Sequence, residues 1–126
     1  MNTILIADDD ESVRSLCRLV LENEGYSVLE AEDVPTCVAQ TRAEKPNLVL
    51  LDWMMPGVDG MDALRILKSS PETRSIPVVM LTALDGMGQI TEATYNGADG
   101  YVTKPFEVDD LLFLIQRFVQ QPVAKA

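Results

Sequence analysis

"TILIADDDESVR", residues 3–14, joins a short apolar run to three consecutive aspartates and then to the start of an amphipathic segment. The run at 3–7 predicts a buried strand, because it is apolar and too short for a stable helix. Apolar residues then recur at helical spacing: Val13, Leu16, Cys17, Val20 and Leu21. This pattern predicts a helix that ends near Gly25. The aspartates at 8–10 lie between strand and helix, and no basic residue relieves their mutual repulsion before Arg14.

The same alternation of strand and helix repeats along the rest of the chain. Further apolar runs predict strands at 26–31, 47–51, 76–82 and 100–103. Helices are expected after them: one from Pro35 to Lys45, one through Leu64 and Leu67 that ends at Pro71, a weaker one from Asp85 to Asn96, and one through Leu111 and Phe118. Strands that alternate with helices form parallel sheets covered on both faces. The chain is therefore predicted to be an α/β protein with a doubly wound, five-stranded parallel sheet and five helices.

Composition narrows the classes of function. The 126 residues suit one domain, expected to span residues 1–121, with 122–126 as a C-terminal tail or the start of a linker. The formal charge of −10 argues against direct binding of nucleic acid, which needs a basic surface. The absence of histidine excludes histidine-zinc sites and Ser-His-Asp triads. No apolar run is long enough for a membrane span, and the first residues lack the features of a signal peptide, so a cytoplasmic location is expected.

Chemically distinctive residues follow the predicted strands, at the ends where ligands bind in doubly wound sheets. They are Asp8 and Asp9 after the first strand, Asp52 after the third, Thr82 and Ala83 after the fourth, and Lys104 and Pro105 after the fifth. Asp10 and Glu11 are instead expected to begin the following helix, where carboxylates favour the free N–H groups.

These residue types predict a site for a cation and a phosphoryl group. Three carboxylates at one edge cannot all stay ionised cheaply unless a hard cation neutralises them, and Mg²⁺ suits so few protein ligands. Lys104 and the Thr82 hydroxyl are suited to bind an anion beside them. The carboxylate of Asp52 is therefore predicted to be the nucleophile in a phosphoryl transfer.

Four segments carry a resemblance to a known family: ILIADDDESVR (4–14), LVLLDWMMPGVDG (48–60), PVVMLTA (77–83) and GADGYVTKPF (97–106). Together they resemble the receiver domain of bacterial response regulators, the phosphoacceptor half of two-component signalling, over essentially the whole chain. The resemblance implies a flavodoxin-like fold with strand order 2-1-3-4-5. It also implies a phosphorylated signalling protein rather than an enzyme.

The resemblance assigns a role to each residue at the sheet edge. Asp52 would accept a phosphoryl group from the histidine of a sensor kinase or a phosphotransfer protein. The implied metal ligands are Asp8 (through water), Asp9, Asp52 and the backbone carbonyl of Met54, with Mg²⁺ as the ion and Mn²⁺ as a substitute. Phosphate binding falls to Thr82, Ala83 and Lys104, and the bond from Lys104 to Pro105 is expected to be cis. Thr82 and Tyr101 would switch a surface made of the fourth helix, fifth strand and fifth helix.

Two alternative functions use the same residues. A degenerate receiver would act only as a protein-interaction module, but such a chain should lack a site residue and none is missing. An Mg²⁺-dependent phosphohydrolase would need a second acid two residues after Asp52, where Met54 stands. The expected partners are thus a kinase or phosphotransfer protein and a downstream protein or an output domain that this chain does not contain, with no membrane partner.

Overall fold

Five strands and four helices make up the described part of this computed structural model, which covers residues 2–53, 60–83, 97–104 and 106–119. The strands are β1 (Thr3–Ala7), β2 (Ser27–Ala31), β3 (Leu48–Asp52), β4 (Val78–Ala83) and β5 (Gly100–Lys104). The helices are α1 (Glu11–Asn23), α2 (Val34–Glu44), α3 (Gly60–Ser69) and α5 (Val108–Phe118). The helix expected from Asp85 to Asn96 lies outside the described residues. Within the described ranges, no helix is both long and apolar enough to cross a membrane.

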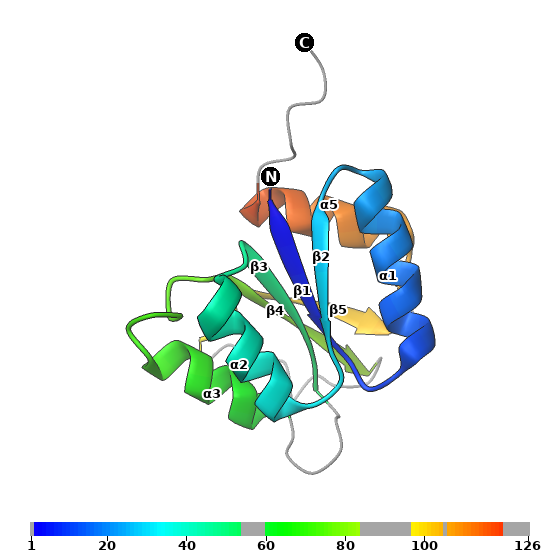
Figure 1. Cartoon of the computed structure of the whole chain (residues 1–126). Coiled ribbons are helices and arrows are strands. Elements are labelled where there is room, and N and C mark those ends of the chain that lie inside the picture. Colours follow the sequence, from blue (N-terminus) through cyan, green and yellow to red (C-terminus); the bar gives the residue numbers. More distant parts are fainter. Residues whose placement is uncertain (1, 54–59, 84–96, 105, 120–126) are drawn as a thin grey trace.

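A single parallel sheet of order β2-β1-β3-β4-β5 forms the centre of the molecule. Figure 1 shows α2 and α3 on one face of this sheet and α1 and α5 on the other. The chain steps from β1 outward to β2 and then returns past β1 to β3, so the direction of strand order reverses between β1 and β3. This arrangement confirms the predicted doubly wound α/β fold and the strand order that the resemblance implied.

Alternate residues of the central strands face opposite helical layers. In β1, Ile4 and Ile6 belong to the apolar core that includes α1 and α5, whereas Leu5 and Ala7 belong to the core that includes α2 and α3. The central strands β3 and β4 alternate in the same way. Because helices cover both faces, these strands are apolar throughout, which is why they appear in the sequence as continuous apolar runs.

Aspartates begin two of the helices. The Asp10 carboxylate accepts a hydrogen bond from the Ser12 amide at 2.9 Å, and the Asp33 carboxylate accepts one from the Thr36 amide at 2.8 Å. Bonds of this kind satisfy backbone donors that the first helical turn leaves without partners. Asp10 is the N-cap of α1 and Glu11 is its first residue, which confirms that these two residues begin the helix. The hydrogen bonds from Ser12 also lower the pKa of Asp10.

The second strand begins one residue later than predicted. The Tyr26 amide donates to the Leu21 carbonyl at 3.0 Å, so Tyr26 still belongs to the turn that ends α1. Gly25 has a φ of 96° in this turn, a conformation that side chains strongly disfavour. The helix periodicity predicted the end of α1 correctly, but the apolar Tyr26 packs into the core from the turn rather than from the strand.

The fourth strand begins at Val78 instead of residue 76. The Ile76 amide donates back to the Thr73 carbonyl at 3.0 Å, which closes a turn before the strand. Pro77 has no N–H, but its carbonyl accepts a hydrogen bond from the Val49 amide at 3.0 Å. The hydrogen bonding between β3 and β4 therefore begins at the Pro77 carbonyl, which proline retains although it has no N–H.

Both cysteines are buried and carry free thiols, as expected for two cysteines in helices without a CxxC spacing. Burial raises the pKa of Cys17 to about 11 and that of Cys37 to about 12. Both thiols are therefore protonated at neutral pH and contribute to the core as small apolar side chains.

A clamp at the amino-terminal edge of the sheet joins α3 to the start of β5. The Lys68 ammonium donates to the Asp99 carboxylate at 2.8 Å and to the Ile76 carbonyl at 2.9 Å. The same Asp99 oxygen accepts from the Val78 amide at 2.8 Å, and the Asp99 amide donates to the Val78 carbonyl at 2.8 Å. The aliphatic part of Lys68 lies so close to Gly97 that an added Cβ would meet its Cγ at 3.1 Å. Backbone and side-chain bonds thus fix β5 immediately before Gly100.

Tyr26→Phe is expected to leave the free energy of unfolding unchanged or to raise it by up to about 1 kcal/mol. The ring is 2% exposed, and its hydroxyl is buried without a hydrogen-bond partner among the described residues. Removing this oxygen keeps the packing and abolishes the cost of desolvating it. Urea denaturation of both proteins measures the difference, with Tyr101→Phe at the exposed tyrosine as the control. A loss of more than 1 kcal/mol in Tyr26→Phe alone would contradict the prediction.

Candidate functional site

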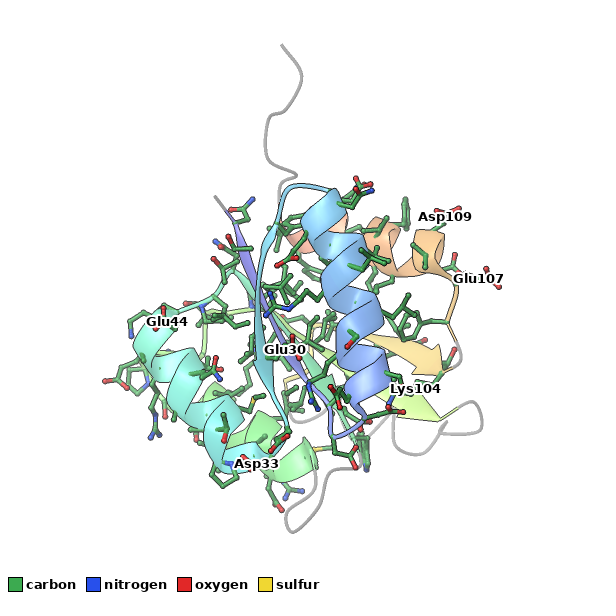
Figure 2. The ribbon with its side chains drawn as sticks, turned by 45° about the vertical axis from the view of Figure 1, so that its right-hand side comes forward. Glu30, Asp33, Glu44, Lys104, Glu107 and Asp109 are labelled. Atoms are coloured by element: carbon green, nitrogen blue, oxygen red, sulfur yellow. The ribbon has the colours of Figure 1, made fainter. Side chains whose placement is uncertain are left out.

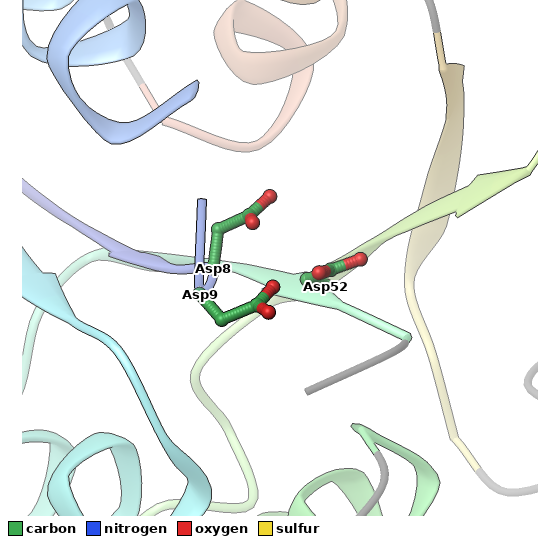
Figure 3. Close-up of side chains that lie close together, drawn as sticks. All are labelled: Asp8, Asp9 and Asp52. Atoms are coloured by element: carbon green, nitrogen blue, oxygen red, sulfur yellow. The ribbon is translucent and has the colours of Figure 1, made fainter. Parts of the chain in front are cut away.

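The carboxylates of Asp8, Asp9 and Asp52 gather where the strand order reverses. Asp8 and Asp9 follow β1, and Asp52 ends β3, which pairs with β1 up to the Ala7 and Leu51 register. One oxygen from each carboxylate lies within 4.8 Å of the others. The close-up in Figure 3 shows the three side chains side by side at this edge. The carboxyl edge at a reversal of strand order is the usual ligand site of a doubly wound fold, so three acids meet at the expected place.

The side chain of Asp8 is completely buried and held from several directions. Its carboxylate accepts from the Asp10 amide at 2.9 Å and from the Lys104 ammonium at 2.8 Å. Its own amide donates to the Ala31 carbonyl of β2 at 3.0 Å. A buried carboxylate requires such partners, because desolvation without them is costly. Asp8 is therefore fixed in position before any ion or phosphate enters the site.

Lys104 reaches the acids from the edge strand β5. Lys104 follows Val102 by two residues, and Val102 packs in the core that contains α1 and α5, so alternation along the strand directs Lys104 to the same side. Its ammonium lies 2.8 Å from Asp8 and 3.3 Å from Asp52. Burial alone would lower the pKa of Lys104, but the hydrogen bonds and charges of Asp8 and Asp52 outweigh it and raise the pKa overall. Lys104 is thus a fixed positive charge at this edge.

The donor set fits a hard divalent cation. Three carboxylates supply only oxygen ligands, and Asp8 and Asp52 are buried whereas Asp9 is exposed. An ion held by few carboxylates and open to solvent on one side matches Mg²⁺, which keeps several waters and takes phosphate oxygens as further ligands. One lysine cannot neutralise three carboxylates, so a cation would also reduce the remaining repulsion.

Asp9→Asn is expected to weaken Mg²⁺ binding by at least about tenfold, because one of three ligand charges is lost at short range. Trp53 supplies the signal: it is the only tryptophan, it adjoins Asp52, and it is 7% exposed. Mg²⁺ titration of its fluorescence measures the affinity. Asp10→Asn removes one negative charge at the adjacent position and keeps a good helix cap. The affinity of this control variant for Mg²⁺ should therefore change much less. Equal losses in both variants would contradict the assignment of Asp9 as a ligand.

An ion-pair network beside the site was not predicted from the sequence. Arg14 donates to the Asp8 carbonyl at 2.8 Å and to the Glu30 carboxylate at 2.9 Å. Arg18 donates to the other oxygen of Glu30 at 2.6 Å and to Glu22 at 2.7 Å. The sequence signal was the position of Arg14 as the first basic residue after the aspartates, but its guanidinium binds the backbone carbonyl of Asp8 rather than the Asp8 carboxylate. Arg14 therefore positions the chain at the site.

Glu30→Gln is expected to lower the free energy of unfolding at pH 7 by about 1–2 kcal/mol. Hydrogen bonds from Arg18, then from Arg14, lower the pKa of Glu30 below its ordinary 4.5. A lowered folded-state pKa stabilises the protein above that ordinary value, and this contribution disappears as the pH falls through the folded-state pKa. The difference between wild type and variant should therefore shrink in urea denaturation below about pH 4.5. The exposed Glu32→Gln serves as the control, and a difference independent of pH would contradict the prediction.

The structure describes the other predicted site residues to different extents. Thr82 and Ala83 end β4, where they pair in register with Thr103 and Lys104. Their backbone therefore lies at the correct edge, whereas their side chains, like Met54 and Pro105, lie outside what the structure describes. Tyr101 is in β5 and its side chain is 49% exposed.

The fold and site together define a doubly wound α/β domain with an acid cluster and a lysine at the carboxyl edge. The family model described as "Response regulator receiver domain" matches residues 4–116. The chain belongs to this family and is a receiver domain of a two-component response regulator, which confirms the resemblance.

Relatives and solved structures agree with this assignment. The chain is 39% identical over 118 residues to the phosphate regulon transcriptional regulatory protein PhoB of Escherichia coli, covering 94% of this chain and 52% of PhoB. It is 44% identical over 109 residues to the response regulator PleD of Caulobacter vibrioides, covering 86% of this chain and 24% of PleD. The chain thus spans about half or less of these relatives.

Two solved structures show the same fold. The Vibrio cholerae chemotaxis protein CheY4 matches with a TM-score of 0.89 and 27% identity, over 94% of this chain and 99% of CheY4. The receiver domain of NtrX from Brucella abortus matches with a TM-score of 0.86 and 29% identity, over 94% of this chain and 99% of that domain.

Proposed function

We propose that this receiver domain accepts a phosphoryl group on Asp52 from a histidine of a sensor kinase or phosphotransfer protein. The observation that carries the proposal is the Lys104 ammonium, which lies 2.8 Å from Asp8 and 3.3 Å from Asp52 beside the acid cluster. An acceptor carboxylate, a cation site and a fixed ammonium are the groups that in-line phosphoryl transfer requires.

The proposed transfer uses each group in a separate role. A carboxylate oxygen of Asp52 forms the new bond to phosphorus while the bond from phosphorus to the donor nitrogen breaks, and the donor imidazole keeps or takes up a proton. Lys104 neutralises charge on the transferred oxygens. Mg²⁺, or Mn²⁺ in its place, would be held by Asp8 (through water), Asp9, Asp52 and the Met54 carbonyl, and would neutralise further charge on the transferred oxygens. The product is an aspartyl phosphate.

The proposed output is a change in the surface around β5. A phosphoryl group adds about −1.5 to −2 units of charge and new charge-assisted bonds to Lys104, the Thr82 hydroxyl and the Ala83 amide. Tyr101 lies on β5, the strand next to β4, and its side chain is exposed. We propose that this side chain turns inward when Asp52 is phosphorylated. Because its relatives are longer, we propose that residues 1–121 act on a downstream protein or on an output domain beyond this chain. The formal charge of −10 supports protein partners rather than nucleic acid or membrane surfaces.

Incubation with a small phosphodonor such as acetyl phosphate tests the proposal directly. With Mg²⁺ present, intact-protein mass spectrometry should show the mass of one phosphoryl group, and chelation of the metal should prevent it. The Trp53 fluorescence should change on addition of Mg²⁺ and again with beryllium fluoride, a mimic of the phosphoryl group. No adduct in the presence of Mg²⁺ and donor would overturn the proposal.

A further inference from the structure

The guanidinium of Arg14, near the start of α1, binds two acceptors that belong to different parts of the fold. One nitrogen donates to the Asp8 carbonyl at 2.8 Å, and another donates to the Glu30 carboxylate at 2.9 Å. Glu30 lies on β2 beside α1 (Figure 2), and its other carboxylate oxygen accepts from Arg18 at 2.6 Å. The Arg14 side chain is only 12% exposed. Arg14 therefore connects the backbone of the acid cluster to a carboxylate that the sheet holds in place.

The backbone of Asp9 is held on both sides. The Asp8 carbonyl belongs to the peptide plane before Asp9, and Arg14 binds this carbonyl. The Asp10 amide belongs to the plane after Asp9, and it donates to the Asp8 carboxylate at 2.9 Å. Because peptide units are planar, holding both planes fixes the two backbone dihedrals of Asp9. These two bonds therefore set the direction in which the Asp9 side chain leaves the backbone, although that side chain is exposed.

We infer that Arg14 is a positioning residue for the metal site: it fixes the peptide plane between Asp8 and Asp9 and so orients the Asp9 carboxylate before a cation binds. The inference rests on the proposed function, because it concerns the same Mg²⁺ site. A ligand that is already oriented loses less conformational freedom on binding. Loss of a group that orients a metal ligand typically lowers metal affinity by about ten- to a hundredfold.

Arg18 provides a matched control for Arg14. It lies one helical turn later on α1 and binds the same Glu30 carboxylate. Its remaining contacts are different, because it donates to the Val28 carbonyl of β2 at 3.2 Å instead of to the Asp8 carbonyl. A role limited to joining α1 to β2 would apply to both arginines, whereas the positioning role applies to Arg14 alone.

The sign of the change in Mg²⁺ affinity separates positioning from charge. Loss of a positive charge near a cation site would strengthen Mg²⁺ binding, whereas loss of a positioning contact would weaken it. Arg14→Gln should therefore weaken Mg²⁺ binding by about tenfold or more in titrations of Trp53 fluorescence. Arg18→Gln should bind Mg²⁺ as tightly as wild type or slightly more tightly. Unchanged or tighter binding in Arg14→Gln, or equal weakening in both variants, would overturn the inference.

Amide hydrogen exchange measured by NMR tests the same role without metal. In metal-free protein, the Asp10 amide should exchange at least about threefold faster in Arg14→Gln than in wild type, because the backbone before it is no longer held. Arg18→Gln should match wild type at this amide. An Asp10 exchange rate that Arg14→Gln leaves unchanged would contradict the inference.

Urea denaturation of both variants establishes that they are folded. If Arg14→Gln does not fold, Arg14→Lys and Arg18→Lys provide the same comparison. Lysine keeps the positive charge but lacks the planar fork that binds two acceptors at once. Mg²⁺ binding should then weaken in Arg14→Lys and not in Arg18→Lys, and equal affinities in the two variants would overturn the inference.

Labelling by acetyl phosphate distinguishes failure of this inference from failure of the proposed function. Arg14→Gln should need about tenfold more Mg²⁺ for half-maximal labelling rate and should approach the wild-type rate at saturating Mg²⁺. Labelling of wild type with the same Mg²⁺ dependence in Arg14→Gln would defeat the inference alone. If wild type is not labelled, the proposed function fails, and the Mg²⁺ titrations and Asp10 exchange rates still decide the role of Arg14.

Discussion

Asp52→Asn is expected to abolish the single phosphoryl adduct that acetyl phosphate and Mg²⁺ produce. Asparagine has nearly the same shape, but its amide oxygen is a poor nucleophile and cannot form an acyl phosphate. The fold should survive, because the substitution removes one of three clustered carboxylates and leaves the Lys104 pair with Asp8 in place. The measurement is intact-protein mass spectrometry over a time course, with urea denaturation to establish that the variant is folded.

Two controls make this result specific to Asp52. Asp10→Asn changes a neighbouring aspartate that caps α1 and should be labelled like wild type. Hydroxylamine treatment should remove the label from wild type, because it cleaves acyl phosphates and leaves phosphate esters of Ser and Thr intact. An adduct that survives Asp52→Asn, or one that resists hydroxylamine, would place the acceptor at another residue.

Lys104→Met is expected to lower the free energy of unfolding by about 3 kcal/mol at neutral pH without divalent cations. The methionine keeps most of the apolar stem, so the loss comes from the charge. Without the ammonium, the fully buried Asp8 and the buried Asp52 would lose the cation that both carboxylates contact, at 2.8 Å and 3.3 Å. Breaking a buried ion pair on one side is costly because the other charge stays desolvated.

A double-mutant cycle tests whether the loss comes from this pairing. Adding Asp8→Asn to Lys104→Met should recover a large part of the lost stability, and Mg²⁺ should also stabilise Lys104→Met more than wild type. Arg117→Met removes the same charge from an exposed position on α5 and should change stability by less than about 0.5 kcal/mol. Equal effects of Lys104→Met and Arg117→Met in urea denaturation would contradict the prediction.

The sequence predicted those features that depend on short-range patterns. The strands predicted at 3–7 and 47–51 are Thr3–Ala7 and Leu48–Asp52 in the structure, so the third strand starts and ends one residue later than predicted. Both are covered on both faces, so their apolar runs were unambiguous, and the acids at their carboxyl ends could be placed from topology alone. Lys104 was placed in the same way, although its distance to Asp8 and its preference for that residue over Asp52 depend on the packing of β5. Tyr26 and Ile76 were assigned to strands because an apolar residue in a buried turn has the same pattern as one in a strand.

Contacts between distant side chains could not be predicted from these patterns. Glu30 binds Arg14 and Arg18 across β2 and α1, and Lys68 binds Asp99 across 31 positions of the chain. Such pairs depend on which faces the final packing brings together, and charged residues on predicted helices are usually solvated. The exposure of Phe113, which is 67% exposed on α5, was not predicted, since periodicity does not reveal which apolar residues of a helix remain uncovered.

The contacts of Asp99 with Lys68 and Val78 anchor one end of β5. Lys68 and Val78 hold the chain immediately before Gly100, whereas the other end of β5 carries Lys104, whose ammonium lies 3.3 Å from Asp52. If the proposed phosphorylation of Asp52 displaces Lys104, the displacement should be distributed over the five residues of β5 and should be largest at Lys104, because the contacts of Asp99 hold the opposite end. Asp99→Ala would remove the contacts with Lys68 and with the Val78 amide, so that a displacement of Lys104 would move the whole strand instead of one end.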